Sequence, residues 1–254
     1  MAGIYEQIIN QLFKVKLEKY DRKIYHIGMK EIGRDEAIQY LSRYLYDLIQ
    51  STIDDVAQQE NGVEKCIQFT NDVIRELGEK FAIENYEDDL VDASNSILTS
   101  VIDKTKCDYP DLQKYIQRIT PLTSLTKSSL FTGAKNSVNM ISELKKEILS
   151  ADEIYIVVSF IRLSGLNMML PELQEFVARG GSLKVITTTY MQISEYKAIE
   201  KLSKLAHTEI KISYHSDLDR LHAKAYVFMR DSGFHTAYIG SSNISHAALT
   251  DGLE

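Results

Sequence analysis

The sequence predicts an α/β fold, a mixed sheet flanked by helices, preceded by an all-α domain. Residues 1–120 carry apolar side chains at helical spacing, whereas strand-like and helix-like segments alternate along residues 121–254. A stretch rich in Ser and Thr that contains Pro121 lies where the pattern changes, and we place the domain boundary there. Strands separated by helices are typical of parallel strands joined by crossover connections.

The all-α domain is expected to contain four amphipathic helices. In each, apolar residues recur every three or four positions and would form a buried stripe. Asp35 is a candidate N-cap of the second helix, and Pro110 suits the first turn of a further helix. The expected helices lie within residues 4–15, 35–49, 66–77 and 88–102.

The two domains differ in charge. Residues 1–120 hold 15 Lys and Arg against 22 Asp and Glu, whereas residues 121–254 hold 14 of each. An acidic surface repels the phosphates of nucleic acid. We therefore expect the helical domain to be a scaffold or a contact surface and not a direct reader of DNA.

Composition favours a cytoplasmic protein. The two cysteines, Cys66 and Cys107, have no metal-ligand spacing and suit a reducing compartment. The N-terminus lacks the basic and apolar regions of a signal peptide, and no apolar run approaches membrane-spanning length.

The α/β domain is expected to begin with a helix and to continue with three strands separated by helices. The strand at 153–160 is almost entirely apolar, which is typical of a sheet covered on both faces. Gly180-Gly181 is interpreted as a helix stop, because no Lys follows at the spacing of a phosphate-binding loop. The expected helices cover residues 138–149, 166–178 and 196–205, and the expected strands residues 153–160, 183–189 and 209–214.

A β-hairpin is predicted at residues 221–243. Side chains alternate along both halves with the period of a strand, and Asp231-Ser-Gly233 between them is typical of a turn. Residues two apart in a strand share a face, so His222 and Lys224 are expected to point the same way.

The hairpin ends in a sequence that suits an anion. Gly240-Ser-Ser-Asn243 leads into a short helical pattern over residues 244–250. Such a turn presents backbone N–H groups with small hydroxyl and amide side chains. An imidazole, an ammonium and an amide would meet at this end of the hairpin, which predicts a site for a phosphoryl group.

The spacing of these residues resembles the signature of the phospholipase D superfamily, which reads H-x-K-x4-D-x6-G-S-x-N. The resemblance covers roughly the second half of the chain and implies a phospholipase D-like mixed sheet. The matching residues are His222, Lys224, Gly240, Ser241 and Asn243.

Two departures accompany the resemblance. The Asp of the signature would fall at Met229 and is absent, and the gap between Lys224 and Gly240 is four residues longer than in the pattern. A longer hairpin with Asp231 displaced into its turn accounts for both.

The resemblance implies a metal-independent phosphodiesterase. His222 would attack the phosphorus and form a phosphohistidine, which water later hydrolyses. Lys224 and Asn243 would bind the nonbridging oxygens, with Lys replacing a metal as the source of positive charge. Glu254 stands where small nucleases of the superfamily carry a Glu that orients the catalytic His. Further phosphate contacts are expected from Gly240, Ser241, Ser242 and Arg220.

A narrower resemblance concerns the substrate. The run from Thr187 through the hairpin to Glu254 is similar to the nuclease domain that precedes a DEAD/DEAH helicase motor in bacterial modification-dependent, type IV restriction enzymes. This implies DNA as substrate and a helicase domain in the same full-length chain. The nuclease step would need no cofactor, whereas the motor, absent from these residues, would need ATP and Mg²⁺. The α/β domain is expected to be truncated at its C-terminal side.

A homodimer is expected through the α/β domain. In the superfamily two such motifs face each other, and this chain supplies one. Two subunits would therefore meet about a two-fold axis.

Other interpretations remain open. The chain could be a non-catalytic phospholipase D-like interaction module of a helicase, which the absent Asp favours, or a phospholipid phosphodiesterase, which no amphipathic stripe supports. A metal site of His222, His235 and His246 lacks a recognised ligand spacing. Ser242 and Ser245 suit caps and turns, and Arg220 could equally be a solvated surface residue.

Overall fold

The computed structural model describes residues 3–103, 110–130, 139–214 and 221–250. The chain divides into two compact units, Met1–Thr99 and Ser100–Glu254. None of the helices within the described ranges has the length and apolar content needed to cross a membrane.

The described part of the first unit is helical, as expected. Its elements are α1 (Gln11–Glu18), α2 (Arg34–Ala57), α3 (Gly62–Phe81) and the short 3-10 helix η1 (Tyr86–Asp89). α1 begins later than predicted, because Asn10 caps it by accepting a hydrogen bond from the N–H of Phe13 at 2.9 Å. Asp35 is not the cap of α2: that position is Gly33, and Asp35 lies in the first turn.

The predicted fourth helix at 88–102 is wrong. Only η1 overlaps it, and residues 90–103 are irregular. The side chain of Asn71 bonds both backbone groups of Val91, and Asp92 accepts from the N–H of Ser94 at 2.8 Å. Such side-chain bonds offer the backbone an alternative to the helical ladder, which apolar periodicity alone does not reveal.

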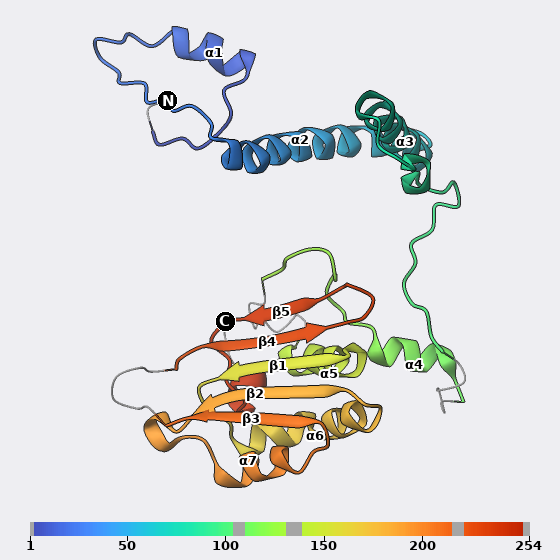
Figure 1. The fold of residues 1–254 in the computed structure, drawn as a ribbon, viewed down its shortest axis with the longest axis vertical. Helices are drawn as coiled ribbons and strands as arrows, with labels where there is room; N and C mark the ends of the chain where they lie inside the picture. The colour runs from blue at the N-terminus through green and yellow to red at the C-terminus, as the bar shows by residue number, and fades with distance from the viewer. Residues whose placement is uncertain (1–2, 104–109, 131–138, 215–220, 251–254) are drawn as a thin grey trace. The chain divides into compact units, whose positions relative to one another are not determined.

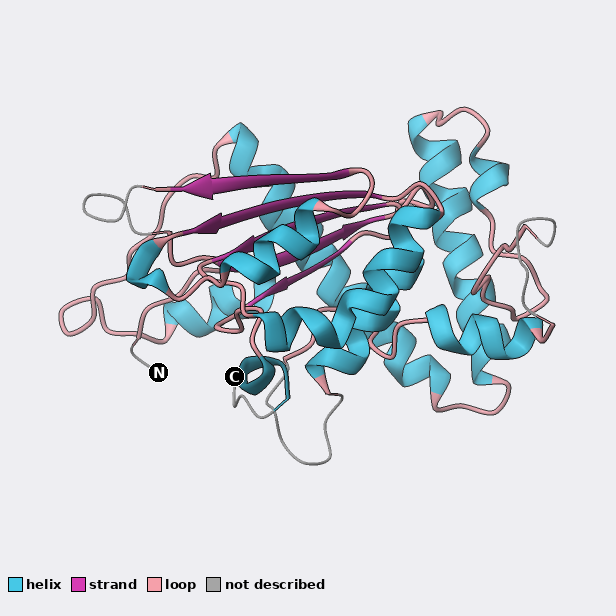
Figure 2. Cartoon of the chain, turned by 90° about the horizontal axis from the view of Figure 1, so that it is seen from below, coloured by secondary structure: helices cyan, strands magenta, loops and turns pink. Residues whose placement is uncertain are grey.

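The second unit is built on a five-stranded mixed sheet in the order β3-β2-β1-β4-β5. β1 pairs in parallel with β2, and β2 with β3, while β4 and β5 are antiparallel (Figure 1). The strands lie side by side in the second view as well (Figure 2). The predicted mixed sheet with parallel first strands is confirmed. The strands are β1 (Glu153–Val158), β2 (Ser182–Thr188), β3 (Thr208–Ser213), β4 (Lys224–Met229) and β5 (Thr236–Ile239).

Helices of the second unit connect these strands and cover one face of the sheet. In Figure 1, α5 and α6 lie behind the strands and α7 lies below β3. Gly180 ends α6 with a φ of +97°, so the double glycine is a helix stop, as predicted. The elements are α4 (Leu112–Ile119), α5 (Met140–Ser150), α6 (Leu163–Ala178), η3 (Tyr190–Gln192), α7 (Tyr196–Ser203) and α8 (His246–Thr250).

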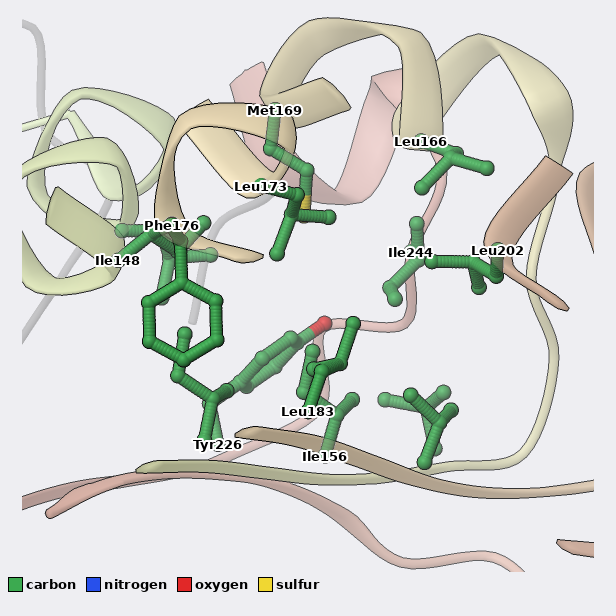
Figure 3. Packing of buried hydrophobic residues seen from close by; sticks show 14 of the residues in the cluster. Ile148, Ile156, Leu166, Met169, Leu173, Phe176, Leu183, Leu202, Tyr226 and Ile244 are labelled. Carbon is green, nitrogen blue, oxygen red and sulfur yellow. The ribbon is translucent and has the colours of Figure 1, made fainter. Parts of the chain in front are cut away.

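The core lies between this sheet face and the helices. In β1, Ile154, Ile156 and Val158 are buried, whereas the alternating residues are only half-buried. Figure 3 shows Ile156 and Tyr226 of the sheet facing Phe176 of α6. The expectation that both faces of β1 are covered is therefore wrong for the described residues. Apolar side chains with high strand propensity occupy its half-buried face as well, which made the strand look buried throughout.

α4 packs with the second unit. Arg118 forms a bidentate ion pair with Glu175 of α6 at 3.0 and 2.6 Å, and the ammonium of Lys146 on α5 donates to the carbonyls of Gln117 and Thr120. The packing boundary at Thr99 thus precedes the compositional boundary near residue 120. The latter stays a prediction about domain organisation.

Candidate active site

The hairpin residues meet the carboxyl ends of the parallel strands at one edge of the sheet. Lys224 is the first residue of β4 and pairs with Val158, the last residue of β1. Because β4 runs antiparallel to β1, its start and the ends of β1 and β2 lie together. Ligands of open α/β sheets bind at this edge.

Lys224 is a buried ammonium held by two acceptors. Only 6% of the residue is exposed, and its Nζ donates to the carbonyl of His222 at 2.8 Å and to Ser159 Oγ at 3.1 Å. An ammonium has three N–H donors, so one remains for a ligand. Burial lowers the pKa of Lys224 from its ordinary value, because the charged form loses hydration.

His222 precedes β4, which begins three residues after the predicted start of the hairpin. His222 is exposed at the edge of the sheet. Its carbonyl is tied to the Lys224 ammonium, so the backbone of His222 is fixed relative to that charge. The exposed His222 thus lies two residues before a buried positive charge that can attract a phosphate group.

Asn243 is fixed beside the same positions. It is 6% exposed, and its Oδ1 accepts from the N–H of Phe160 at 3.1 Å. Phe160 follows Ser159, so adjacent residues hold Lys224 and Asn243. With Oδ1 engaged, the Nδ2 amino group of Asn243 is the part of this side chain that can donate to an anion.

Ser159 and Gly165 are residues of this site that the sequence did not single out. Ser159 is buried, and its hydroxyl bonds the Lys224 ammonium across 65 residues of sequence. Gly165 of α6 lies so close to the loop after Asn243 that an added Cβ would be 2.5 Å from the backbone nitrogen of Ser245. A polar residue directly after an apolar strand could have indicated Ser159. The sequence holds no comparable signal for Gly165.

The turn after β5 is ordered by its own contacts. Gly240 N–H donates to the carbonyl of Lys224 at 3.2 Å, and Ser241 is exposed. Ser242 is buried; its hydroxyl donates to the carbonyl of Ala248 at 2.9 Å, and its carbonyl accepts from Tyr226. α8 has five residues, so its helix dipole contributes little to anion binding. Lys224 and Asn243 are the stronger candidates for binding a phosphate.

The other candidate residues have different positions. Arg220 and Glu254 lie outside the described residues. His235 accepts from the N–H of Arg230 at 3.1 Å, which shapes the hairpin turn, and Thr250 bonds His246. Asp231 lies in that turn, where Gly233 has a φ of +82°. The described ranges contain no cluster of His, Cys, Asp and Glu that could hold a metal ion.

The comparison with protein-family models finds one match in the second half of the chain. Residues 136–253 match the model of the NgoFVII restriction endonuclease N-terminal PLD domain, a segment that includes the entire hairpin and its flanking turn. The recognition of a phospholipase D domain is confirmed for this segment. No curated protein matches the chain.

Solved structures also match part of the chain. NucT from Helicobacter pylori has 16% identity and a TM-score of 0.35, and the match covers 45% of this chain and 72% of that one. The phospholipase D family member Nuc from Salmonella typhimurium has 21% identity and a TM-score of 0.31, with 43% and 67% covered.

Proposed function

We propose that residues 136–253, which match the model of the NgoFVII restriction endonuclease N-terminal PLD domain, cut DNA without a metal ion, through a phosphohistidine on His222. One observation carries this proposal above all. The buried Lys224 ammonium is fixed between the His222 carbonyl and Ser159, beside Asn243. The residues that we propose as nucleophile, positive charge and amide donor therefore lie at one edge of the sheet.

The first step forms the covalent intermediate. An imidazole nitrogen of His222 attacks the phosphorus, a P–N bond forms, and the P–O bond to the leaving strand breaks. The leaving oxygen takes a proton from a second, protonated His. Lys224 and Asn243 stabilise the charge that develops on the nonbridging oxygens.

The second step releases the product. Water attacks the phosphorus, gives a proton to the second His, and the P–N bond breaks. Glu254 would hold the tautomer of His222, while Arg220, Ser241 and the backbone around Gly240 and Ser242 would contact the phosphate.

The same resemblance also suggests how the domain is assembled with other domains and subunits. The domain would work as a homodimer through the α/β unit, in a longer cytoplasmic restriction protein with a helicase motor. ATP and Mg²⁺ would serve the motor, and the nuclease step itself needs neither.

The test is cleavage of a labelled plasmid by the purified chain, by a His222→Ala variant and by His246→Ala as the matched control. We expect cleavage to persist in excess EDTA, to vanish in His222→Ala and to survive in His246→Ala. A phosphohistidine hydrolyses in acid, so the labelled covalent intermediate should not survive acid quenching. Rapid denaturation at alkaline pH should preserve it on the enzyme.

Near-normal cleavage by His222→Ala would end the nucleophile assignment. Loss of activity on chelation that Mg²⁺ restores would overturn the metal-independent mechanism. Binding of DNA without cleavage by the intact chain would favour the non-catalytic interaction module.

A further inference from the structure

A pocket of about 660 Å³ lies between residues 123–130 and the edge strand β5. Its volume is within the range of pockets that hold small organic ligands. Its lining includes Lys224 and the turn from Gly240 to Ser242, so the pocket shares residues with the candidate active site. The reaction proposed above does not use the rest of this space.

The wall formed by residues 123–130 is anchored by a buried carboxylate. Glu143 of α5 is fully buried and accepts hydrogen bonds from the N–H groups of Leu122 and Thr123 at 2.9 and 2.8 Å. The hydroxyl of Thr123 donates to the same carboxylate at 2.5 Å and lies 3.3 Å from the hydroxyl of Tyr238 on β5. These contacts fix the start of the wall against the sheet.

The opposite side is fixed by a second buried carboxylate. Glu147 accepts from Tyr238 at 2.6 Å, from Thr236 at 2.7 Å and from the guanidinium of Arg230. Both sides of the pocket are thus attached to α5, and the space between them is built into the fold.

The lining suits a nucleotide. Hydroxyl groups of residues 123–129, together with Lys127, offer hydrogen bonds and positive charge, and no acidic side chain is among the described residues that line the pocket. Leu130 and Ile239 are large apolar residues of the lining that are 84% and 85% exposed. Nucleobases combine flat apolar faces with polar edges, so they would cover these side chains and use the hydroxyl groups.

We propose that this pocket holds the base and sugar of the nucleotide next to the phosphate that is cut. The proposal rests on the nuclease function, because it takes its position from the phosphate held at Lys224 and Asn243. It assigns residues 123–130 and β5 to the choice of substrate, whereas the hairpin end performs the reaction.

The experiment measures binding in a His222→Ala background, so that no DNA is consumed. Two short fluorescent single strands of equal length are compared, one with bases and one with base-free sugars. We expect the strand with bases to bind at least about fivefold more tightly, because a base that covers these apolar side chains removes their surface from water. The double variant Leu130→Ala/Ile239→Ala should remove this difference, because it deletes the exposed apolar lining.

Ile186→Ala is the matched control. Ile186 is an aliphatic residue of the same sheet, is 41% exposed and lies outside the pocket lining, so its substitution costs folding at least as much as that of Ile239. The preference for bases should survive in this control. Equal affinities for the two strands, or a preference that the double variant retains, would overturn the pocket proposal. Absence of cleavage by the unsubstituted chain, with the preference intact, would instead refute the nuclease function alone.

Discussion

Lys224 shows at the scale of a residue how burial and charge are balanced. Its stem enters the core side of the sheet, and desolvation of its ammonium is offset by Ser159 and the His222 carbonyl. Burial still lowers its pKa. This direction has a consequence for catalysis, because only the protonated form can stabilise the charge on a phosphate.

The first prediction follows from the lowered pKa of Lys224. Lys224 should lose its proton at a lower pH than an exposed lysine, whose pKa is about 10.4. Cleavage should therefore decline on the alkaline side below the usual lysine range. Lys224→Arg should shift this decline to higher pH, because a guanidinium stays charged. Lys224→Ala should lose at least ~3 kcal/mol of transition-state stabilisation.

The measurement is kcat/KM against pH on a short labelled DNA. Lys211→Ala is the control, since Lys211 is an exposed lysine of β3. An alkaline decline that stays in place in Lys224→Arg would show that another group causes it.

At the scale of elements, α6 and the turn after β5 hold each other in place. Ile161 forms a bridge with Ile244, and the N–H of Arg162 donates to the carbonyl of Ile244 at 2.8 Å. Gly165, one turn further along, permits the close approach of the helix to this segment. Asn243 lies directly before it, so the packing of α6 sets the position of a candidate catalytic amide.

Gly165→Ala should therefore act on both stability and activity. The new Cβ would lie 2.5 Å from the nitrogen of Ser245, and backbone cannot move away as a flexible side chain can. We expect a loss of about 1–3 kcal/mol in the free energy of unfolding, as for other overpacked sites, with slower cleavage. Urea unfolding and initial rates would measure the two effects.

The neighbouring Ser164→Ala provides the control, because Ser164 is exposed on the same turn of α6. It should change neither quantity appreciably. Wild-type stability and rate in Gly165→Ala would mean that the close contact is not needed for the site.

At the scale of the whole molecule, the candidate mechanism needs two histidines and the motif supplies one. The same His222 from a second chain can act as the acid if two hairpin ends face each other across a two-fold axis. Symmetry would then bring two Lys224 ammonium groups to one phosphate, and these charges would attract the anion.

Mixed dimers test this arrangement. Wild-type and His222→Ala chains with different tags are expressed together, and the hybrid is purified by both tags in succession. Each hybrid site would lack either the nucleophile or the acid, so cleavage should be far below half of the wild-type rate. A chain that sediments as a monomer at the assay concentration and is fully active would contradict the shared site.

The sequence by itself determined the parts that depend on local patterns. Period-two alternation and the Asp231-Ser-Gly233 turn predicted β4 and β5, and alternating helices and strands predicted that β1, β2 and β3 are parallel. The spacing of His222, Lys224 and Asn243 predicted the phospholipase D resemblance that the family model bears out for residues 136–253. These signals lie within short stretches, where backbone geometry fixes which residues share a face.

Only the tertiary structure decided what joins distant stretches. Ser159 meets Lys224 across 65 residues, Asn243 meets Phe160 across 83, and Glu143 fixes Thr123 across 20. The irregular chain at 90–103, expected as a helix, is likewise set by the side chain of Asn71. Such contacts leave no periodicity in sequence, because each depends on where two packed elements bring single side chains together.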